Sequence, residues 1–520
     1  MAHFSTVIAD LADRYGERIA LRDRHGEMTY SAFAAEIFRF GSGLLALGEL
    51  SLGDRVAILL PDIREYLLAD YGIMCAGLVR VPLDPRLAEA ELAAQLTLAE
   101  VRAVITDRDG AARLAAAMPD VDLVVVCVSK ATGVSQRGYL GFDEVIAAGS
   151  ANRPEGGSKD DLAALNFSGG STGRPKATMI PHRTFAAVLE TVPKAFKIHS
   201  DDIFLNVRPL WPIAQVVAMA YLGAGAILHL SGKFRPETFA EAVRDSGATR
   251  SSLVPTQLVR LLDHIETDEP HLATLTAIHV GGSRLPPAAF HNALSRIGAR
   301  IGILYGLTEA PVTTYLAPEE FAAARSAADI EALMGASGTV LDGYDVMLGG
   351  GGGDGDGVLG PSGEVMIRGP HVMDGYLKEP ELTAQALEDG WLHTNDLGAF
   401  DADGRLHIVG RLKDVIRSGA SSILPKEVED ALATNPHLED VAVVGIPDVE
   451  WGEIVVAFAV RKPGSAIKER EVIDSCDPSL ARFKRPKQVH FVNEIPRSHY
   501  GKVLRPQLLA RLTDTAPSGA

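Results

Sequence analysis

The sequence has little that suits a metal site, a disulfide framework or a membrane span. Its three cysteines, Cys75, Cys127 and Cys476, lie far apart in 520 residues and lack metal-ligand spacing. Reduced thiols in a cytosolic protein are therefore expected. The longest apolar run, Val216 to Leu228, contains two glycines and is too short to cross a bilayer, so it predicts a buried helix or a pair of strands.

Positive charge is scarce as well. The chain carries 50 Lys and Arg against 67 Asp and Glu, a formal net charge of -17, and a short basic run at residues 482–487. Nucleic acid and anionic membrane are therefore poor partners. The first residues also lack a basic segment followed by an apolar one, so no signal peptide is expected and the predicted location is the cytoplasm.

Helix and strand patterns alternate through the first half of the chain. Apolar runs of strand length occupy residues 55–60, 101–106 and 123–128, and residues 33–47 repeat apolar side chains at the spacing of one helix face. This alternation is typical of α/β proteins with mostly parallel sheets. At 520 residues the chain is expected to form more than one domain.

The character of the sequence changes near Lys413. The residues that follow predict strand 415–416, helix 426–434, strands 441–445 and 454–460, a second helix and strand 488–492. This pattern predicts a small α+β unit, so we place a large domain at 1–412 and a small one at 413–520. The Gly- and Asp-rich residues 349–357 predict a flexible surface turn between strands.

Residues 168–176 have the composition of a phosphate-binding loop. In Ser-Gly-Gly-Ser-Thr-Gly-Arg-Pro-Lys, three glycines leave the backbone amides open to an anion, while Arg174 and Lys176 add positive charge. A surface turn is the alternative for such a loop taken alone. The Walker pattern is excluded, because Pro175 precedes the lysine and Ala177 stands where that motif has its magnesium-binding hydroxyl.

Four further segments carry groups suited to a nucleotide site. They are Gly281-Gly282-Ser283-Arg284, Tyr305-Gly306-Leu307-Thr308-Glu309, Trp391-Leu392-His393-Thr394-Asn395-Asp396 and the segment from Pro496 to Lys502. Glycine backbone admits a flat ring, tyrosine offers an aromatic face, and carboxylates accept hydrogen bonds from sugar hydroxyls. Each segment alone also suits a turn, a core aromatic or a solvated surface, but their occurrence together favours one shared site.

These motifs, in this order, resemble the adenylate-forming superfamily of acyl-CoA synthetases, adenylation domains and luciferases. The resemblance runs from about Thr29 to Arg505 and includes 168–176, 305–309, 363–369 with Gly375-Tyr376, the hinge motif 410–414 and Gly501-Lys502. It implies an α/β fold, with a large N-terminal domain of parallel-rich sheets and a distorted β-barrel, and a small mobile α+β C-terminal domain. The implied activity is formation of acyl-AMP from ATP and a carboxylic acid.

The resemblance also implies roles for particular residues. The residues that would bind phosphate are Ser168, Gly169, Gly170, Ser171, Thr172, Gly173 and Lys176. Those that would form the adenine site are Gly281, Gly282, Ser283, Tyr305 and Gly306. Asp396 and Arg411 would bind the ribose. Thr308 would contact the α-phosphate and Glu309 would hold Mg²⁺. Lys502 would stabilise the charge that develops as a carboxylate attacks the α-phosphorus.

A second half-reaction would transfer the acyl group to a thiol. In the superfamily the small domain rotates about a hinge, here Lys413, and opens a pantetheine tunnel that Ser418, Gly419 and Ala420 would line. The thiol would be that of CoA, or alternatively the phosphopantetheine arm of a carrier protein supplied in trans.

The acyl pocket candidates are Trp211, Gln215, Gly281 and Gly306. A flat apolar wall with one amide favours an aromatic or cyclic acid.

Three positions depart from the superfamily pattern. Gly169 replaces a serine, Asn395 replaces a glycine before Asp396, and Ala420 replaces a glycine in the tunnel segment. The Ser-Gly-Gly-Ser-Thr-Gly form is associated with enzymes that adenylate aromatic acids. The departures leave open a non-catalytic nucleotide sensor, against which the intact Glu309, Asp396, Arg411 and Lys502 argue. Monomer and homodimer both stay open.

Overall fold

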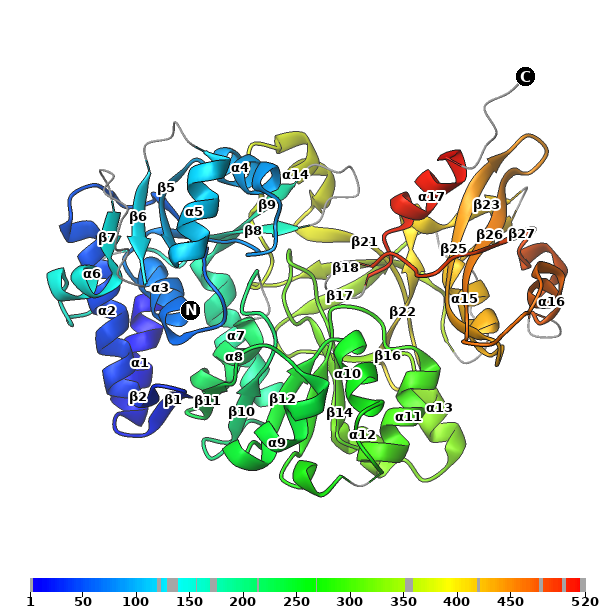
Figure 1. Cartoon of the computed structure of the whole chain (residues 1–520), viewed down its shortest axis with the longest axis horizontal. Helices are drawn as coiled ribbons and strands as arrows, with labels where there is room; N and C mark the ends of the chain where they lie inside the picture. The colour runs from blue at the N-terminus through cyan, green and yellow to red at the C-terminus, as the bar shows by residue number, and fades with distance from the viewer. Residues whose placement is uncertain are drawn as a thin grey trace.

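The computed structural model describes residues 3–118, 123–128, 139–155, 157–168, 175–212, 215–267, 269–350, 359–418, 421–476, 480–497 and 502–514. Figure 1 shows a large unit that runs from blue to yellow and a smaller orange-to-red unit beside it. The predicted phosphate loop from Gly169 to Arg174, the tunnel residues Gly419 and Ala420, and most of the Gly- and Asp-rich turn lie outside the described residues.

An eight-stranded sheet of described residues forms one layer of the large unit. Its order is β19-β9-β8-β4-β3-β5-β6-β7. The pairs from β8 to β7 are parallel, whereas β9 pairs antiparallel with both β8 and β19. The strands are β3 (Arg55–Leu59), β4 (Val79–Pro82), β5 (Val101–Thr106), β6 (Val124–Cys127), β7 (Tyr139–Gly141), β8 (Leu162–Ser168), β9 (Lys176–Pro181) and β19 (Gly375–Tyr376). The predicted strands near 55, 101 and 123 are confirmed.

A second sheet, with fourteen strands among the described residues, forms the rest of the large unit. Its parallel part is β11 (Ile227–Leu230), β10 (Ile203–Asn206), β12 (Arg250–Leu253), β13 (Ala277–Val280) and β14 (Ile301–Tyr305), with β1 (Ile19–Asp23) and β2 (Gly26–Thr29) at one edge. Its antiparallel part is β15 (Thr314–Leu316), β16 (Ala336–Val340), β22 (Leu406–Arg411), β21 (Trp391–Phe400), β18 (Gly363–Arg368) and β17 (Asp345–Gly349), with β20 (Leu387–Glu388) on β21. The sheet therefore changes from parallel to antiparallel just after β14.

Helices cover both sheets of the large unit. They are α1 (Phe4–Tyr15), α2 (Tyr30–Ala46), α3 (Arg64–Cys75), α4 (Glu89–Leu98), α5 (Arg108–Ala117), α6 (Phe142–Ala148), α7 (His182–Ala195), α8 (Gln215–Gly223), α9 (Pro236–Ser246), α10 (Pro255–Leu262), α11 (Pro287–Ile297), α12 (Pro318–Ala323), α13 (Ala327–Leu333), α14 (Pro380–Ala386) and the 3₁₀ turn η1 (Pro270–Leu272). The apolar run that begins at Val216 is the buried helix α8 followed by β11, and no described helix is long and apolar enough to span a membrane.

The small unit has its own sheet and its own apolar cores. The sheet consists of β23 (Ile416–Ser418), β24 (Ser421–Ile423), β25 (Leu438–Asp448), β26 (Gly452–Arg461) and β27 (Gln488–Phe491), with α15 (Pro425–Ala433), α16 (Glu469–Asp474), α17 (Arg505–Asp514) and the turn η3 (Arg482–Lys484). Its two buried apolar clusters contain residues from Ile416 onward, whereas the three clusters of the large unit end at Leu406. The connection between them is the turn η2 (Leu412–Asp414), which contains the predicted hinge residue Lys413.

Candidate active site

Asp396 is held in place by two neighbours. It lies on β21 directly opposite Arg411 on β22, because these two residues are partners in the antiparallel pair. Arg411 Nε lies 2.8 Å from Asp396 Oδ1, and the hydroxyl of Tyr305, at the end of β14, donates to Oδ2 at 2.9 Å. Burial raises the pKa of Asp396, while Arg411 and Tyr305 act in the opposite direction. The structure thus brings together three residues from three predicted motifs.

The backbone before Asp396 explains one departure from the superfamily pattern. Asn395 has a φ of 57°, in the left-handed region that favours glycine. Asparagine is among the few other residues that adopt this conformation without a large cost. Its backbone N–H donates to Glu364 Oε1 at 3.0 Å. Asparagine therefore supplies the geometry that glycine would, and this substitution gives no support to the non-catalytic alternative.

Glu309 is bound to a tyrosine that had no predicted role. The hydroxyl of Tyr376, on β19, donates to Glu309 Oε1 at 2.9 Å, and the ammonium of Lys176 lies 5.6 Å from the centre of the same ring. Burial, followed by the Glu309 charge, raises the pKa of Tyr376. Because β9 begins at Lys176 and pairs with β19, the exit of the predicted phosphate loop lies next to Glu309. The sequence signal was present in Gly375-Tyr376, which matched a motif but was assigned no chemistry.

The loops after β13 and β14 require bare backbone. A Cβ on Gly281 would lie 2.4 Å from the Leu304 side chain, and one on Gly306 would lie 2.4 Å from the Val312 nitrogen. Gly282 has a φ of 97°, which also selects glycine. The carboxyl ends of adjacent parallel strands meet at one edge of a sheet, where α/β proteins commonly bind nucleotides. Thr308 and Glu309 follow on the second of these loops.

Arg411, Lys413 and Lys502 lie within electrostatic reach of Asp396, and Lys176 lies within reach of Lys413. Partial burial, then the positive charges of Arg411 and Lys413, lower the pKa of Lys502 to about 8, although this side chain keeps contact with solvent. Burial also lowers the pKa of Lys413, and Arg411 and Lys176 add to that effect while Asp414 and Asp396 oppose it. Cations repel when they are gathered in this way, so the cluster fits a polyanion such as a triphosphate.

The site around Glu309 suits a metal ion that is held mainly by nucleotide phosphates rather than by the protein. Among the described residues, no group of three or more His, Cys, Asp or Glu side chains could hold a metal. Mg²⁺ is commonly held by one or two carboxylates together with phosphate oxygens and water. A single carboxylate at Glu309 beside the phosphate loop fits that arrangement.

A buried polar cluster includes Asn166 of β8, the strand that ends at Ser168. We use this name for Asp70, Arg80, Asn166 and Gln215. Arg80 Nη1 lies 2.5 Å from Asp70 Oδ1, and both side chains are fully buried. Burial raises the pKa of Asp70, and Arg80 and Gln215 act against this rise. Sequence reasoning missed the pair, because Asp70 lies within the buried part of α3 and Arg80 within an apolar strand.

The cluster connects two parts of the predicted site. Arg80 Nη2 donates to Asn166 Oδ1 on β8 and to the Pro212 carbonyl, each at 3.3 Å. Asn166 lies two residues before Ser168, where β8 ends, and Pro212 follows Trp211. Trp211 is buried, with the Arg86 guanidinium 5.0 Å from its ring centre. Trp211 and Gln215 thus lie at this cluster, and their role in an acyl pocket stays a prediction.

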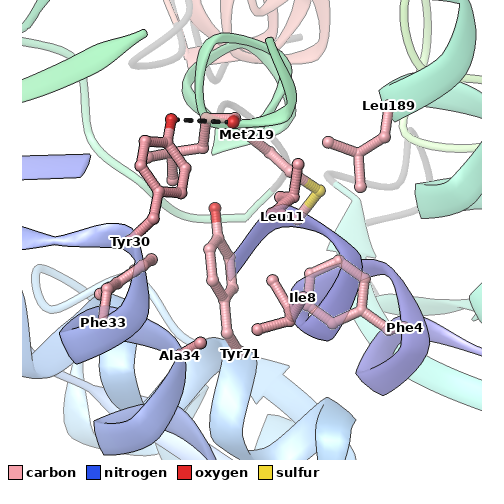
Figure 2. Close-up of a pocket in the computed structure, with 10 residues that line it drawn as sticks. Phe4, Ile8, Leu11, Tyr30, Phe33, Ala34, Tyr71, Leu189 and Met219 are labelled. Carbon is pink, nitrogen blue, oxygen red and sulfur yellow. Dashed lines mark hydrogen bonds between the residues drawn. The ribbon is translucent and has the colours of Figure 1, made fainter. Parts of the chain in front are cut away.

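A cavity elsewhere in the large unit is too small for a substrate. Figure 2 shows it among residues of α1, α2, α3, α7 and α8, with the Tyr30 hydroxyl donating to the Leu222 carbonyl of α8. Its volume of about 10 Å³ holds one water molecule at most. None of the predicted site residues lines it. We regard it as a packing gap.

The remaining predicted residues are only partly described. Ser168 ends β8, and Ser418 is a buried residue that pairs with Gly452 across β23 and β26. The backbone of Gly169 to Gly173 and of Gly419 and Ala420 lies outside the described residues. Phosphate and thiol binding by those residues stay predictions.

The fold and the site define an adenylate-forming enzyme. Residues 8–377 match the family model of the AMP-binding enzyme, and residues 427–502 match that of the AMP-binding enzyme C-terminal domain. The chain therefore belongs to the AMP-binding enzyme family. The resemblance to the adenylate-forming superfamily and the predicted fold class are confirmed.

Individual relatives cover nearly the whole chain. It is 32% identical over 516 residues to 4-coumarate–CoA ligase 1 of Solanum tuberosum, covering 96% of this chain and 92% of that protein. It is 29% identical over 513 residues to 3-[(3aS,4S,7aS)-7a-methyl-1,5-dioxo-octahydro-1H-inden-4-yl]propanoyl:CoA ligase of Rhodococcus jostii, covering 95% and 96%. The crystal structure of ATP-bound MatB from Rhodopseudomonas palustris superimposes with a TM-score of 0.86 at 28% identity, over 98% of this chain and 99% of that one.

Proposed function

We propose that this AMP-forming CoA ligase activates a ring-bearing carboxylic acid and transfers the acyl group to CoA. The observation that carries the proposal is the salt bridge of Arg411 to Asp396, with Lys413 and Lys502 within electrostatic reach of the same carboxylate and Lys176 within reach of Lys413. A triphosphate would relieve the repulsion among these cations, and Asp396 offers a carboxylate to ribose hydroxyls.

Each site residue has a task in the first half-reaction. Tyr305, whose hydroxyl is held by Asp396, presents its ring to the adenine. The other side of the adenine site is lined by residues with no side chain or a small one, namely Gly281, Gly282, Ser283 and Gly306. Lys502 draws the acid carboxylate and the α-phosphate together, two anions that otherwise repel, and stabilises the negative charge that develops between them. Mg²⁺, when bound at Glu309 and the phosphates, would neutralise charge on the departing pyrophosphate.

Transfer to the thiol would follow after the small unit rotates about Lys413. In the described structure Lys502 already lies within electrostatic reach of Asp396, Arg411 and Lys413. This arrangement suits adenylation, whereas access of a thiol requires the lysine to leave. We therefore propose that the chain is divided functionally at 412/413.

The substrate class is inferred from the names of two related ligases and from the flat ring of Trp211. Both ligases described above are named for acids attached to a ring system. A buried tryptophan offers a flat apolar surface to such an acid.

Carboxylate-dependent exchange of pyrophosphate into ATP tests the proposal. The panel contains hydroxycinnamates, benzoates, cyclohexane carboxylates and straight-chain acids, and Lys502→Ala is the blank. Exchange with a ring-bearing acid is expected, and exchange restricted to straight-chain acids contradicts the substrate class. Acyl transfer to free CoA, compared with transfer to a purified carrier protein, separates the two acceptors.

A further inference from the structure

One ion pair joins the adenine-site loop to the small unit. Arg284 follows Gly281, Gly282 and Ser283 in the loop after β13, and its Nη1 lies 2.5 Å from Oδ1 of Asp430 on α15. The two residues are 146 positions apart in the sequence. Each side chain is 35% exposed, so water reaches the pair from one side. Such a pair can form and break without burying an isolated charge.

A second contact lies beside this pair. Lys426, at the start of α15, donates from Nζ to the Ile408 carbonyl of β22 at 3.3 Å. Burial, followed by the nearby Arg284 charge, lowers the pKa of Lys426 to about 8. Leu424 approaches Gly410 so closely that a Cβ there would lie 3.0 Å from its side chain. The start of α15 is thus seated against the large unit.

Charges at the nucleotide site act on Lys502 in both directions. Arg411 of the large unit repels its ammonium, whereas Asp396 and Asp414 attract it. Because these effects oppose one another, attraction elsewhere at the boundary adds directly to the hold on the lysine. The ion pair between Arg284 and Asp430 supplies attraction from the loop that also forms the predicted adenine wall.

We propose that Arg284 and Asp430 are a positioning pair that holds the small unit with Lys502 at the nucleotide site and opens before thioester formation. The inference rests on the proposed function, whose two half-reactions need different placements of Lys502. Neither residue touches the reacting atoms, so both act through the lysine.

Charge reversal tests the pair. Arg284→Asp and Asp430→Arg are each expected to slow pyrophosphate exchange about five- to tenfold, in the range typical of coupling between sites. Thioester formation from supplied acyl-adenylate and CoA should be unchanged or faster in both. The double reversal Arg284→Asp/Asp430→Arg restores the attraction with opposite polarity and should recover exchange. Equal loss in both half-reactions, no loss, or no recovery in the double variant would overturn the proposal.

A matched control uses an ion pair inside the small unit. Arg470 and Asp474 pair across one turn of α16, are more exposed, and touch no part of the predicted site. Reversal of either should leave both half-reactions unaltered. A loss of exchange in these variants equal to that of Arg284→Asp would mean that altered net charge, rather than the pair, governs exchange.

The distance between the large and the small unit can be measured without any enzyme activity, so it tests the positioning pair independently of the proposed function. Leu52 in the large unit and Val449 in the small unit are exposed, whereas the three native cysteines are buried, so Leu52→Cys/Val449→Cys accepts spin labels selectively. Arg284→Asp should reduce the fraction of molecules that show the label-to-label distance of the described structure, and the double reversal should restore that fraction. An unchanged distribution overturns the positioning pair even if the enzyme is fully active. Absence of exchange by the wild-type chain with every acid overturns the proposed function instead.

Discussion

The two ion pairs Asp70–Arg80 and Arg284–Asp430 have similar N–O distances but very different surroundings. The first is fully buried, with Arg80 also donating to Asn166 and to the Pro212 carbonyl. The second is about one-third exposed and joins the large unit to the small one. A fully buried ion pair cannot separate without leaving a charge in an apolar core, whereas a partly exposed pair can separate because water then solvates both charges. The difference fits the proposal that the large unit keeps its site fixed while the small unit moves at the boundary between them.

Breaking the buried pair should give the largest effect. Arg80→Met leaves the Asp70 carboxylate buried without its partner and should lower the free energy of unfolding by about 3–5 kcal/mol. Asp70→Leu/Arg80→Met removes both charges and should recover most of the loss. Urea unfolding followed by circular dichroism measures both. A loss in the double variant as large as in the single one would mean that packing, not charge, maintains this region.

Removing Lys502 should affect catalysis and leave stability alone. Lys502→Ala is expected to slow pyrophosphate exchange about 10²- to 10³-fold, the usual effect of deleting one group that stabilises developing charge. The unfolding midpoint should stay at the wild-type value, because the residue keeps contact with solvent and has both cations and carboxylates within electrostatic reach, whose effects oppose each other. A shifted unfolding midpoint would mean that Lys502 also stabilises the folded protein.

The pH dependence of exchange should report the same lysine. The pKa of Lys502 lies near 8 and the protonated form is the active one, so kcat/KM for exchange should be level below pH 8 and fall about tenfold per unit above it. Lys502→Arg should move this alkaline limb upward, since the guanidinium stays charged. Substrate ionisation is common to both proteins and cancels in the ratio. An identical limb in the two proteins would assign it to another group.

The smallest expected effect concerns the backbone before Asp396. Asn395→Gly should change the free energy of unfolding by less than about 0.5 kcal/mol, whereas Asn395→Ala should lower it by about 1 kcal/mol, because a Cβ without a polar group is disfavoured at this positive φ. Chemical unfolding of the two variants side by side provides the measurement. Equal stability of both would show that the left-handed geometry is not strained.

The sequence motifs predicted the parts of the site that follow one another locally. Glycine loops after strands predicted the bare, closely packed backbone at Gly281 and Gly306. The motif at Asp396 and the hinge motif at Arg411 contained two residues that pair across β21 and β22. The alternation of helix and strand likewise predicted the α/β class.

Contacts between distant segments could not be predicted in this way. Tyr376 with Glu309, Arg80 with Asn166 and Arg284 with Asp430 are separated by 67, 86 and 146 residues, and no local periodicity relates such pairs. The identity of Asn395 alone does not reveal its positive φ, so the sequence marks this position only as a departure from the superfamily pattern. The backbone geometry gives the reason for asparagine there.

We propose that the boundary between the units separates the two half-reactions, with Lys502 serving only the first. The most direct test supplies purified acyl-adenylate and CoA to Lys502→Ala and follows thioester formation against the wild-type protein. We expect a rate within about twofold of wild type, since a residue used only in the adenylation transition state does not affect a later step. A loss in thioester formation as large as the loss in pyrophosphate exchange would contradict it.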